Sequence, residues 1–186
     1  ESDEDKVDIK VNHNHIYFWC DVTKKSSLDL TIKLRNAYSK ISQLTMPEDD
    51  KIPLYLHINS YGGEVDAALG VVDTMESLKR SGARIITIVE GYAASAATLI
   101  SVSGSERRMM THSYLRIHGM SASVWGKKSE LDDEHCNFGK VEDILINIYK
   151  NKTELNTREI KKLMSREIDL LPKDCIKKGI VDKIQL

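Results

Sequence analysis

The stretches IPLYLHINSYGG (52–63) and RIITIVEGYAAS (84–95) decide the fold of this chain. Each is a run of β-branched and other apolar residues that ends in a turn of small residues. A segment with apolar residues at helical spacing follows each turn, over 64–81 and 96–102. Strand, turn and helix repeated in this order predict βαβ units and a largely parallel sheet.

The flanking sequence continues this alternation. Ser26 and Asp29 have capping-box-like spacing at the start of an amphipathic helix. The other expected elements are strands at 16–20, 108–110, 114–117 and 180–184, a long polar helix at 128–152, and helices at 156–164 and from Pro172 to Gly179. We therefore expect one α/β domain over 11–186, with a protruding helical handle at about 120–152, after a flexible acidic N-terminus at 1–10.

The composition excludes several classes of function. The 186 residues are 41% hydrophobic and 30% charged, which is an ordinary globular balance. A formal net charge of −1 gives no electrostatic case for binding nucleic acid or an anionic membrane. The three cysteines are scattered and no His/Cys cluster has ligand spacing, so we expect a reduced, cytoplasmic protein without a disulfide framework, metal or other cofactor.

The first turn contains adjacent glycines, Gly62 and Gly63, directly before a helix. Glycines allow positive φ and a close approach of the backbone, so their N–H groups can face an anion or an oxyanion. Taken alone, such a pair is more often an ordinary tight turn. Its meaning therefore depends on the second turn.

The second turn places Ser95 at the start of a helix. An N-cap is the commonest task of a serine there. However, Ala93, Ala94, Ala96 and Ala97 clear the space on both sides of its hydroxyl, as a nucleophile needs when a carbonyl must approach it. The helix amides, including that of Ala96, would face the place where negative charge develops during the attack.

Together, NSYGGEV (59–65) and GYAAS (91–95) resemble the ClpP family of serine peptidases, the proteolytic subunits of the Clp protease. The resemblance runs from about Ile16 to the C-terminus and includes the closing GIVD (179–182). The INSYGG turn and the early Phe18–Trp19 look more like a divergent, phage-type member, for which the location would be a host cytoplasm.

The resemblance implies a ClpP/crotonase-like spiral of βαβ units and a set of site residues. Ser95 would be the nucleophile, and the backbone at Gly62, Gly63 and Ala96 would form the oxyanion hole. His118 carries the family's Ile-His pattern at a strand end and would be the general base. Gly119 and Met120 follow it, where the family usually has Gln-Pro.

The third catalytic group has two candidates. The family supplies an Asp about twelve residues before the glycine that closes the last helix, and a gapless count from Gly179 gives Glu167. A Glu can orient an imidazole as an Asp does. A deletion of two residues would instead select Asp169, which otherwise falls where the family has a buried aromatic, an awkward place for a charge. We prefer Glu167, with Asp169 as the alternative, and either could be a solvated surface acid.

The resemblance also implies partners. The first half of the arm helix would be the handle between two stacked heptameric rings, a tetradecamer whose serines line an internal chamber. The substrate would be a peptide or unfolded protein, fed by a separate AAA+ unfoldase, because the chain has no GxxxxGK[ST] motif and its own chemistry needs no ATP. The apolar axial loop of the family is not recognisable in Glu1–Lys10, which leaves unfoldase docking open.

Two other functions remain compatible with the same sequence. One is a catalytically inactive subunit that contributes only assembly contacts. The other is an acyl-CoA hydratase or isomerase on the crotonase superfold, whose oxyanion hole also uses backbone amides at such turns. The second has no need of Ser95 or His118 and usually requires a longer chain.

Overall fold

The computed structural model describes residues 9–44, 52–121 and 123–185. Most of the N-terminus that we expected to be flexible, residues 1–8, lies outside these ranges. Within them, Ile9 is buried in the core and the first strand already begins at Lys10. The folded part therefore starts earlier than the sequence suggested.

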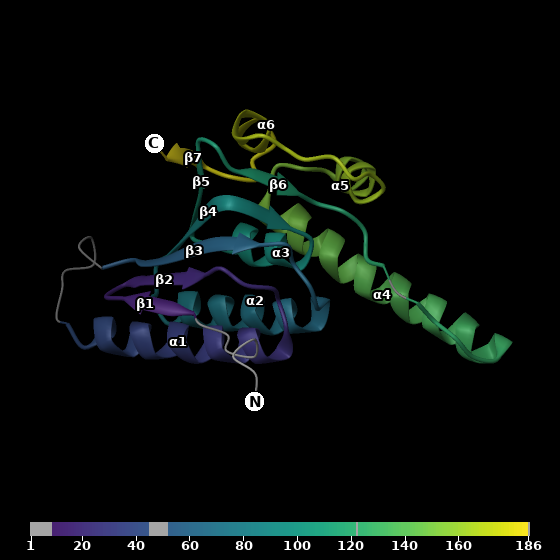
Figure 1. Ribbon diagram of the computed structural model, residues 1–186, viewed down its shortest axis with the longest axis horizontal. Coiled ribbons are helices and arrows are strands. Elements are labelled where there is room, and N and C mark those ends of the chain that lie inside the picture. Colours follow the sequence, from purple (N-terminus) through teal and green to yellow (C-terminus); the bar gives the residue numbers. More distant parts are fainter. Residues whose placement is uncertain (1–8, 45–51, 122, 186) are drawn as a thin grey trace.

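The elements alternate between strands and helices as expected, which confirms the α/β class (Figure 1). In chain order they are β1 (Lys10–Asn12), β2 (His15–Phe18), α1 (Lys24–Ser42), β3 (Leu54–Ser60), α2 (Val65–Arg80), β4 (Ile85–Ala94), α3 (Ala96–Val102), β5 (Glu106–Met110), β6 (Tyr114–Arg116), α4 (Lys128–Lys152), α5 (Thr157–Met164), α6 (Pro172–Lys177) and β7 (Lys183–Gln185).

The sheet has the strand order β1-β2-β3-β4-β5-β7, with β6 paired to β4 outside this path. Strands β1 and β2 are antiparallel, and every other pairing is parallel. Strand β4 serves two neighbours in succession, because 86–89 pair with β5 and 92–94 pair with β6. The carboxyl end of β4 is thus directed toward β6.

A bulge in the β3–β4 pairing accompanies this change of neighbour. The register shifts between Ile58 and Ser60, so that Ser60 pairs with Ala93. Gly91 lies in the shifted segment with a φ of 80°, and a Cβ there would lie 3.2 Å from the Asn59 side chain. Because a bulge bends its strand and increases the local twist, it re-aims the end of β4.

The start of α1 differs from the sequence expectation. The N-cap is Thr23, whose Oγ1 accepts a hydrogen bond from the Ser26 N–H at 3.1 Å, and the Ser26 hydroxyl completes the capping box. Ser26 is fully buried in the first turn. Asp29 instead forms an i,i+4 ion pair with Lys33 at 2.8 Å. The sequence pattern alone does not distinguish a serine buried in the first turn, such as Ser26, from a serine exposed at the N-cap.

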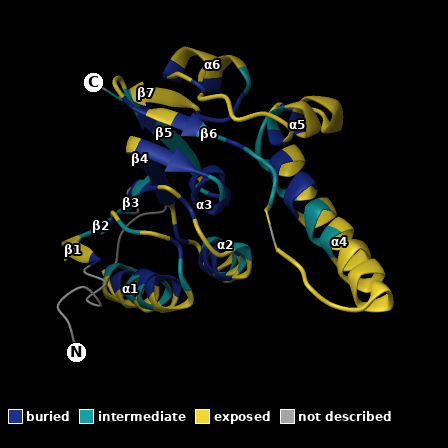
Figure 2. Cartoon of the chain, turned by 45° about the vertical axis from the view of Figure 1, so that its right-hand side comes forward, coloured by how far each residue is buried: buried dark blue, intermediate teal, exposed yellow. Residues whose placement is uncertain are grey.

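The long helix α4 projects from the domain, and the half near Lys128 is exposed (Figure 2). Its other half is anchored by buried Leu145, Ile146 and Tyr149. The Tyr149 hydroxyl lies 2.6 Å from Thr98 Oγ1 on α3, which fixes the root of the arm to the helix that follows Ser95. Across the described ranges no helix, α4 included, is long and apolar enough to cross a membrane.

Candidate active site

Ser95 occupies a strained position between β4 and α3. Its φ of 53° and ψ of −130° are outside the regions that L-residues normally adopt, which costs about 1–3 kcal/mol. Its backbone N–H donates to the Arg116 carbonyl at 3.0 Å, and its carbonyl accepts from the Thr98 N–H at 2.9 Å. The side chain makes no capping hydrogen bond. The strained turn therefore presents a hydroxyl that has no structural task.

Gly62 lies directly against this serine. A Cβ at Gly62 would lie 2.6 Å from both the Ala94 carbonyl oxygen and the Ser95 Cβ, and φ at Gly62 is 96°. Glycine is therefore the residue that lets the two turns approach each other. The Gly62 N–H donates to Ser60 Oγ at 3.1 Å, so this amide is already committed.

Gly63 is enclosed on its other side by the segment before α1. A Cβ there would lie 2.2 Å from the Val22 carbonyl oxygen. Val22 also bridges the turn, since its N–H donates to Gly62 O at 2.7 Å and its carbonyl accepts from the Glu64 N–H at 2.8 Å. Among the described residues, no acceptor is found for the N–H groups of Gly63 and Ala96. The sequence analysis predicted three backbone N–H groups for an oxyanion hole, and these two are the ones that remain free to bind an oxyanion.

His118 follows β6 on the edge of the sheet where β4 ends. The parallel register pairs Ala94 with Arg116, so the two strands deliver Ser95 and His118 to the same edge. Buried Ile117 fixes the segment between the strand and the imidazole. The next residue, Gly119, donates its N–H to the Met164 carbonyl at 2.7 Å, so the backbone at the Gly-Met departure from the family pattern is fixed to the end of α5.

The carboxylate beside His118 belongs to Glu167. Leu115 and Leu170 form an antiparallel bridge with hydrogen bonds of 3.0 and 2.7 Å, and continuing this pairing sets Glu167 opposite His118. The contact is 3.2 Å, from Glu167 Oε1 to His118 Nδ1. Of the two acids in question, the structure therefore brings Glu167 to the imidazole.

Asp169 faces Arg116 instead. The guanidinium donates from Nε to Asp169 Oδ1 at 2.7 Å and from Nη2 to Oδ2 at 2.9 Å. The Tyr92 hydroxyl donates to the same carboxylate at 3.3 Å. The expectation that a charge would be awkward at this position is wrong, because Asp169 is exposed and paired.

The charges of this pair are well defined at neutral pH. Hydrogen bonds from Arg116 lower the pKa of Asp169, so its carboxylate is ionised. Burial and the adjacent negative charge of Asp169 raise the pKa of Tyr92 to about 12, so its hydroxyl remains a neutral donor. Asp169 is therefore a fixed anion rather than an acid that exchanges protons.

Arg116 is the residue of the site that sequence reasoning missed. Besides Asp169, it contacts Glu167, with 3.2 Å between Nη1 and Oε2. A signal was present in the sequence: Arg116 and His118 are two residues apart, as are Glu167 and Asp169. Two segments with this spacing match opposite charges when they pair antiparallel, because alternate residues share a face.

A pocket of about 610 Å³ begins at this site and extends between α2 and α4. Gly63 from the first turn and Met120 from the segment after His118 both line it. Its apolar lining is completed by Val65, Leu69, Phe138 and Val141. The pocket thus connects the first turn and the segment after His118 with α4.

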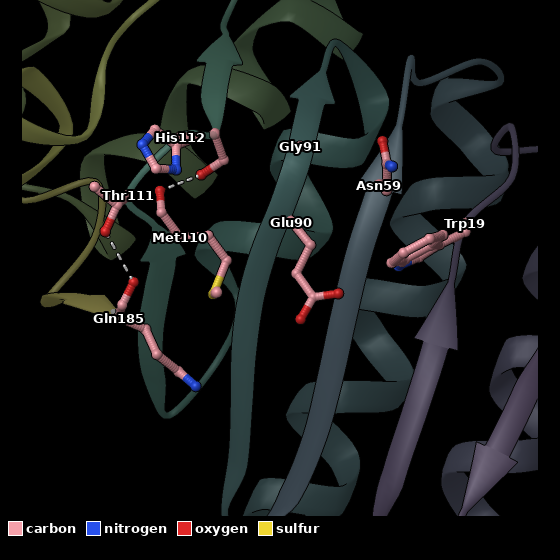
Figure 3. Close-up of a pocket in the computed structure, with 9 residues that line it drawn as sticks. Trp19, Asn59, Glu90, Gly91, Met110, Thr111, His112 and Gln185 are labelled. Atoms are coloured by element: carbon pink, nitrogen blue, oxygen red, sulfur yellow. Dashed lines mark hydrogen bonds between the residues drawn. The ribbon is translucent and has the colours of Figure 1, made fainter.

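A second pocket, of about 700 Å³, lies elsewhere on the sheet, between Trp19, Asn59 and Glu90 on one side and Met110 and Gln185 on the other (Figure 3). His112 and Ser113 also line it. However, the Ser113 hydroxyl donates to the Met110 carbonyl at 2.7 Å and closes the β5–β6 turn. Because this hydroxyl is committed, the pocket holds a structural serine rather than a competing nucleophile.

In the described part of the chain, no three or more His, Cys, Asp or Glu side chains are gathered as potential metal ligands.

Fold and site together define a class of protein: an α/β domain with a largely parallel sheet that carries serine, histidine and carboxylate side chains at one sheet edge. The sequence profile of the family described as Clp protease matches residues 16–185. The chain therefore belongs to the Clp protease family, which confirms the resemblance found in the two turns.

Curated relatives extend this finding at moderate identity. A protein of Nephroselmis olivacea is 29% identical over 160 residues, covering 85% of this chain and 76% of the relative. A Deinococcus radiodurans protein is 28% identical, covering 82% and 76%, and one from Borreliella afzelii is 27% identical, covering 74% and 69%. All three are named ATP-dependent Clp protease proteolytic subunit.

Gly62→Ala is expected to damage the site, because the added Cβ meets Ser95 and the Ala94 carbonyl and because φ is positive there. We expect a loss of about 1–3 kcal/mol in the free energy of unfolding. Gly70→Ala in α2 is the matched control, since a Cβ there meets nothing within 4 Å. It should instead add about 0.5–1 kcal/mol. Urea unfolding of both variants checks this, and equal shifts would contradict the close approach.

Proposed function

We propose that this chain is the catalytic core of a serine-type endopeptidase, with Ser95 as nucleophile, His118 as general base and Glu167 as the acid that orients it. The observation that carries the proposal is the 3.2 Å contact between His118 and Glu167 at the sheet edge where Ser95 stands in a strained turn. A merely structural serine has no reason to hold φ at 53° with an uncommitted hydroxyl.

In the proposed mechanism, His118 Nε2 takes the proton of Ser95 as its oxygen attacks the peptide carbonyl carbon. Glu167 holds Nδ1–H, which sets the tautomer and stabilises the imidazolium. The N–H groups of Gly63 and Ala96 bind the oxyanion of the tetrahedral intermediate. His118 then gives the proton to the leaving amine as the C–N bond breaks, and an acyl-enzyme on Ser95 remains.

Water completes the cycle. His118 removes a proton from a water molecule that attacks the ester carbonyl, and a second tetrahedral intermediate forms in the same oxyanion site. Its collapse returns the proton to Ser95 and releases the new carboxyl terminus. No step requires a cofactor or ATP, so the hydrolysis itself is ATP-independent. The pocket at Gly63 and Met120 is placed to receive a side chain of the substrate.

We further propose a ring-shaped homo-oligomer of two stacked heptamers, a tetradecamer, with the sites facing an internal chamber. The exposed half of α4, which includes the exposed side chain of Leu131, supports this proposal, because none of the described elements of the single chain covers this half of the helix. The relatives' name, which includes "ATP-dependent" and "proteolytic subunit", supports a separate ATPase as partner and protein as substrate. We propose that this ATPase is an AAA+ unfoldase, that the substrate is a peptide or unfolded protein, and that the protease works in the cytoplasm. A formal net charge of −1 favours neither nucleic acid nor membrane.

The proposal is tested by incubating the purified chain with short fluorogenic peptides and with unfolded casein, without nucleotide, after sizing by gel filtration. We expect a ring-sized assembly that hydrolyses the peptides. A ring-sized assembly that cleaves neither substrate would contradict the proposal in favour of a non-catalytic assembly subunit. Hydration of an enoyl-CoA by the same preparation would favour the crotonase-type alternative.

A further inference from the structure

We infer that Arg116 is a positioning residue for the proposed triad, because it holds the Glu167 carboxylate in the orientation that faces His118. This inference rests on the proposed function and deepens it. The two oxygens of Glu167 are divided between two partners: Oε1 lies 3.2 Å from His118 Nδ1, and Oε2 lies 3.2 Å from Arg116 Nη1.

The guanidinium is itself held on its other edge. Nε and Nη2 of Arg116 form a two-pronged pairing with Asp169 at 2.7 and 2.9 Å. Because a guanidinium is planar, this pairing fixes the direction of the remaining Nη1 donor. Arg116 also stands on β6, whose pairing with β4 is continuous with the turn at Ser95. Asp169 thus anchors Arg116, and Arg116 anchors Glu167.

Glu167 needs such an anchor. Its side chain is 67% exposed, whereas that of His118 is 25% exposed. A solvent-exposed Glu samples several rotamers, and a single contact of 3.2 Å does not repay the entropy of ordering it. A second partner on the opposite oxygen selects the rotamer in which the first contact is made. The two contacts together form the row Asp169–Arg116–Glu167–His118.

Charged and titratable side chains from three parts of the fold contribute to this row or lie beside it. Glu167 and Asp169 come from the segment between α5 and α6, and Tyr92 and Tyr114 come from β4 and β6. The rings of Tyr92 and Tyr114 lie 4.4 Å apart, beside the Asp169–Arg116 pair that the Tyr92 hydroxyl contacts. Of these groups, Arg116 carries the positive charge that stands between the two carboxylates.

Arg116 therefore has two separate effects, one on the orientation of Glu167 and one on the net charge that faces the His118 imidazole. It orients Glu167, which favours the correct imidazole tautomer and raises kcat. Its positive charge also offsets part of the negative charge that Glu167 presents to the imidazole. Removing the charge should lower kcat and raise the pKa of His118 at the same time. A residue with only a structural role would lower stability without moving that pKa.

The test compares Arg116→Met, Arg116→Lys and Asp169→Asn with the matched control Arg84→Met, which removes an exposed arginine paired with Glu106 at 2.9 Å on another edge of the sheet. Two readouts are used. The first is kcat and KM for a short peptide across pH 5–9. The second is the NMR titration of the His118 imidazole in a Ser95→Ala background, which requires no activity.

For Arg116→Met we expect kcat about 10-fold lower, KM within about twofold, and a His118 titration displaced to higher pH. The acid limb of kcat/KM should move to higher pH by the same amount, because the active form carries neutral His118. Arg116→Lys keeps the positive charge but loses the two-pronged pairing with Asp169. The His118 titration of this variant should therefore stay near that of the wild type, and its kcat should lie between those of Arg116→Met and the wild type. Arg84→Met should match the wild type in both readouts.

The inference is overturned if Arg116→Met has the wild-type kcat and an unchanged His118 pKa. It is also overturned if the Met and Lys variants lose activity equally with no change in that pKa, since that is the behaviour of a purely structural residue. If Arg116→Met fails to fold, the inference is tested with Arg116→Lys and Asp169→Asn. A wild-type kcat in both of these variants would refute it. An unchanged His118 pKa in Arg116→Met, measured in the Ser95→Ala background, refutes the positioning role even if the wild type is active. A raised His118 pKa in Arg116→Met, when the wild type has no peptidase activity, supports the row of contacts and refutes the proposed function alone.

Discussion

Replacing Ser95 with Ala is expected to lower kcat for peptide hydrolysis about 10⁶-fold, the scale of loss when a triad nucleophile is removed from a comparable serine peptidase. The hydroxyl has no capping hydrogen bond, so its removal should leave the fold and the assembly intact. Alanine also fits the space, because its side chain is that of serine without the hydroxyl oxygen. Initial rates on one fluorogenic peptide, with gel filtration of each preparation, measure the effect.

The matched control is Ser39→Ala, which removes an exposed hydroxyl on α1 far from the sheet edge. This variant should keep the wild-type kcat. Peptidase activity that persists in a clean Ser95→Ala preparation would assign the activity to another nucleophile. Loss of the ring-sized assembly together with the activity would show that the serine supports the fold rather than the chemistry.

Glu167→Gln is expected to lower kcat by between about 10² and 10⁴, because an amide in place of the carboxylate favours the wrong imidazole tautomer and no longer stabilises the imidazolium. KM should change little, since the contact of 3.2 Å is to His118 and not to substrate. Asp169→Asn is the comparison on the same segment. It loosens Arg116 only, so its kcat should fall by less than about 10-fold.

The opposite ranking would refute the assignment. If Asp169→Asn were inactive and Glu167→Gln nearly normal, the third group would lie two residues further along the chain than we place it. If neither substitution changed kcat, the imidazole would be oriented by another group. Both variants are to be assayed on one peptide at one pH, with the assembly checked in each preparation.

Much of the fold could be predicted because its elements are long and periodic. The strand ending at Ser60, the helix α2 and the arm α4 agree with their predicted spans to within a few residues. In contrast, β1 was missed, because a strand of three exposed residues has no hydrophobic alternation to detect. The turn that follows it depends on His13 at a φ of 54°, which no local pattern announces.

The parts of the site that lie within one segment of the sequence could be predicted, whereas the contacts between segments could not. The two turns, the histidine and a gapless count identified residues that the structure gathers at one sheet edge. The strain at Ser95 could not be predicted, because it arises from the hydrogen bond to the Arg116 carbonyl and the approach of Gly62. The contribution of Arg116 depends on pairing between segments about fifty residues apart, and sequence spacing fixes no such pairing without a structure.

The central claim, that Ser95 is a nucleophile activated by the groups around it, is tested most directly by labelling with a fluorophosphonate and measuring intact mass. The account predicts one adduct per chain, located on Ser95 by peptide mapping, with no adduct on Ser95→Ala and much slower labelling of Glu167→Gln. The probe reacts with a serine only when a base removes its proton and donors receive the oxyanion, so the measurement reports the assembled site. No adduct on the folded wild-type chain, or equal labelling of wild type and Ser95→Ala, would contradict the account.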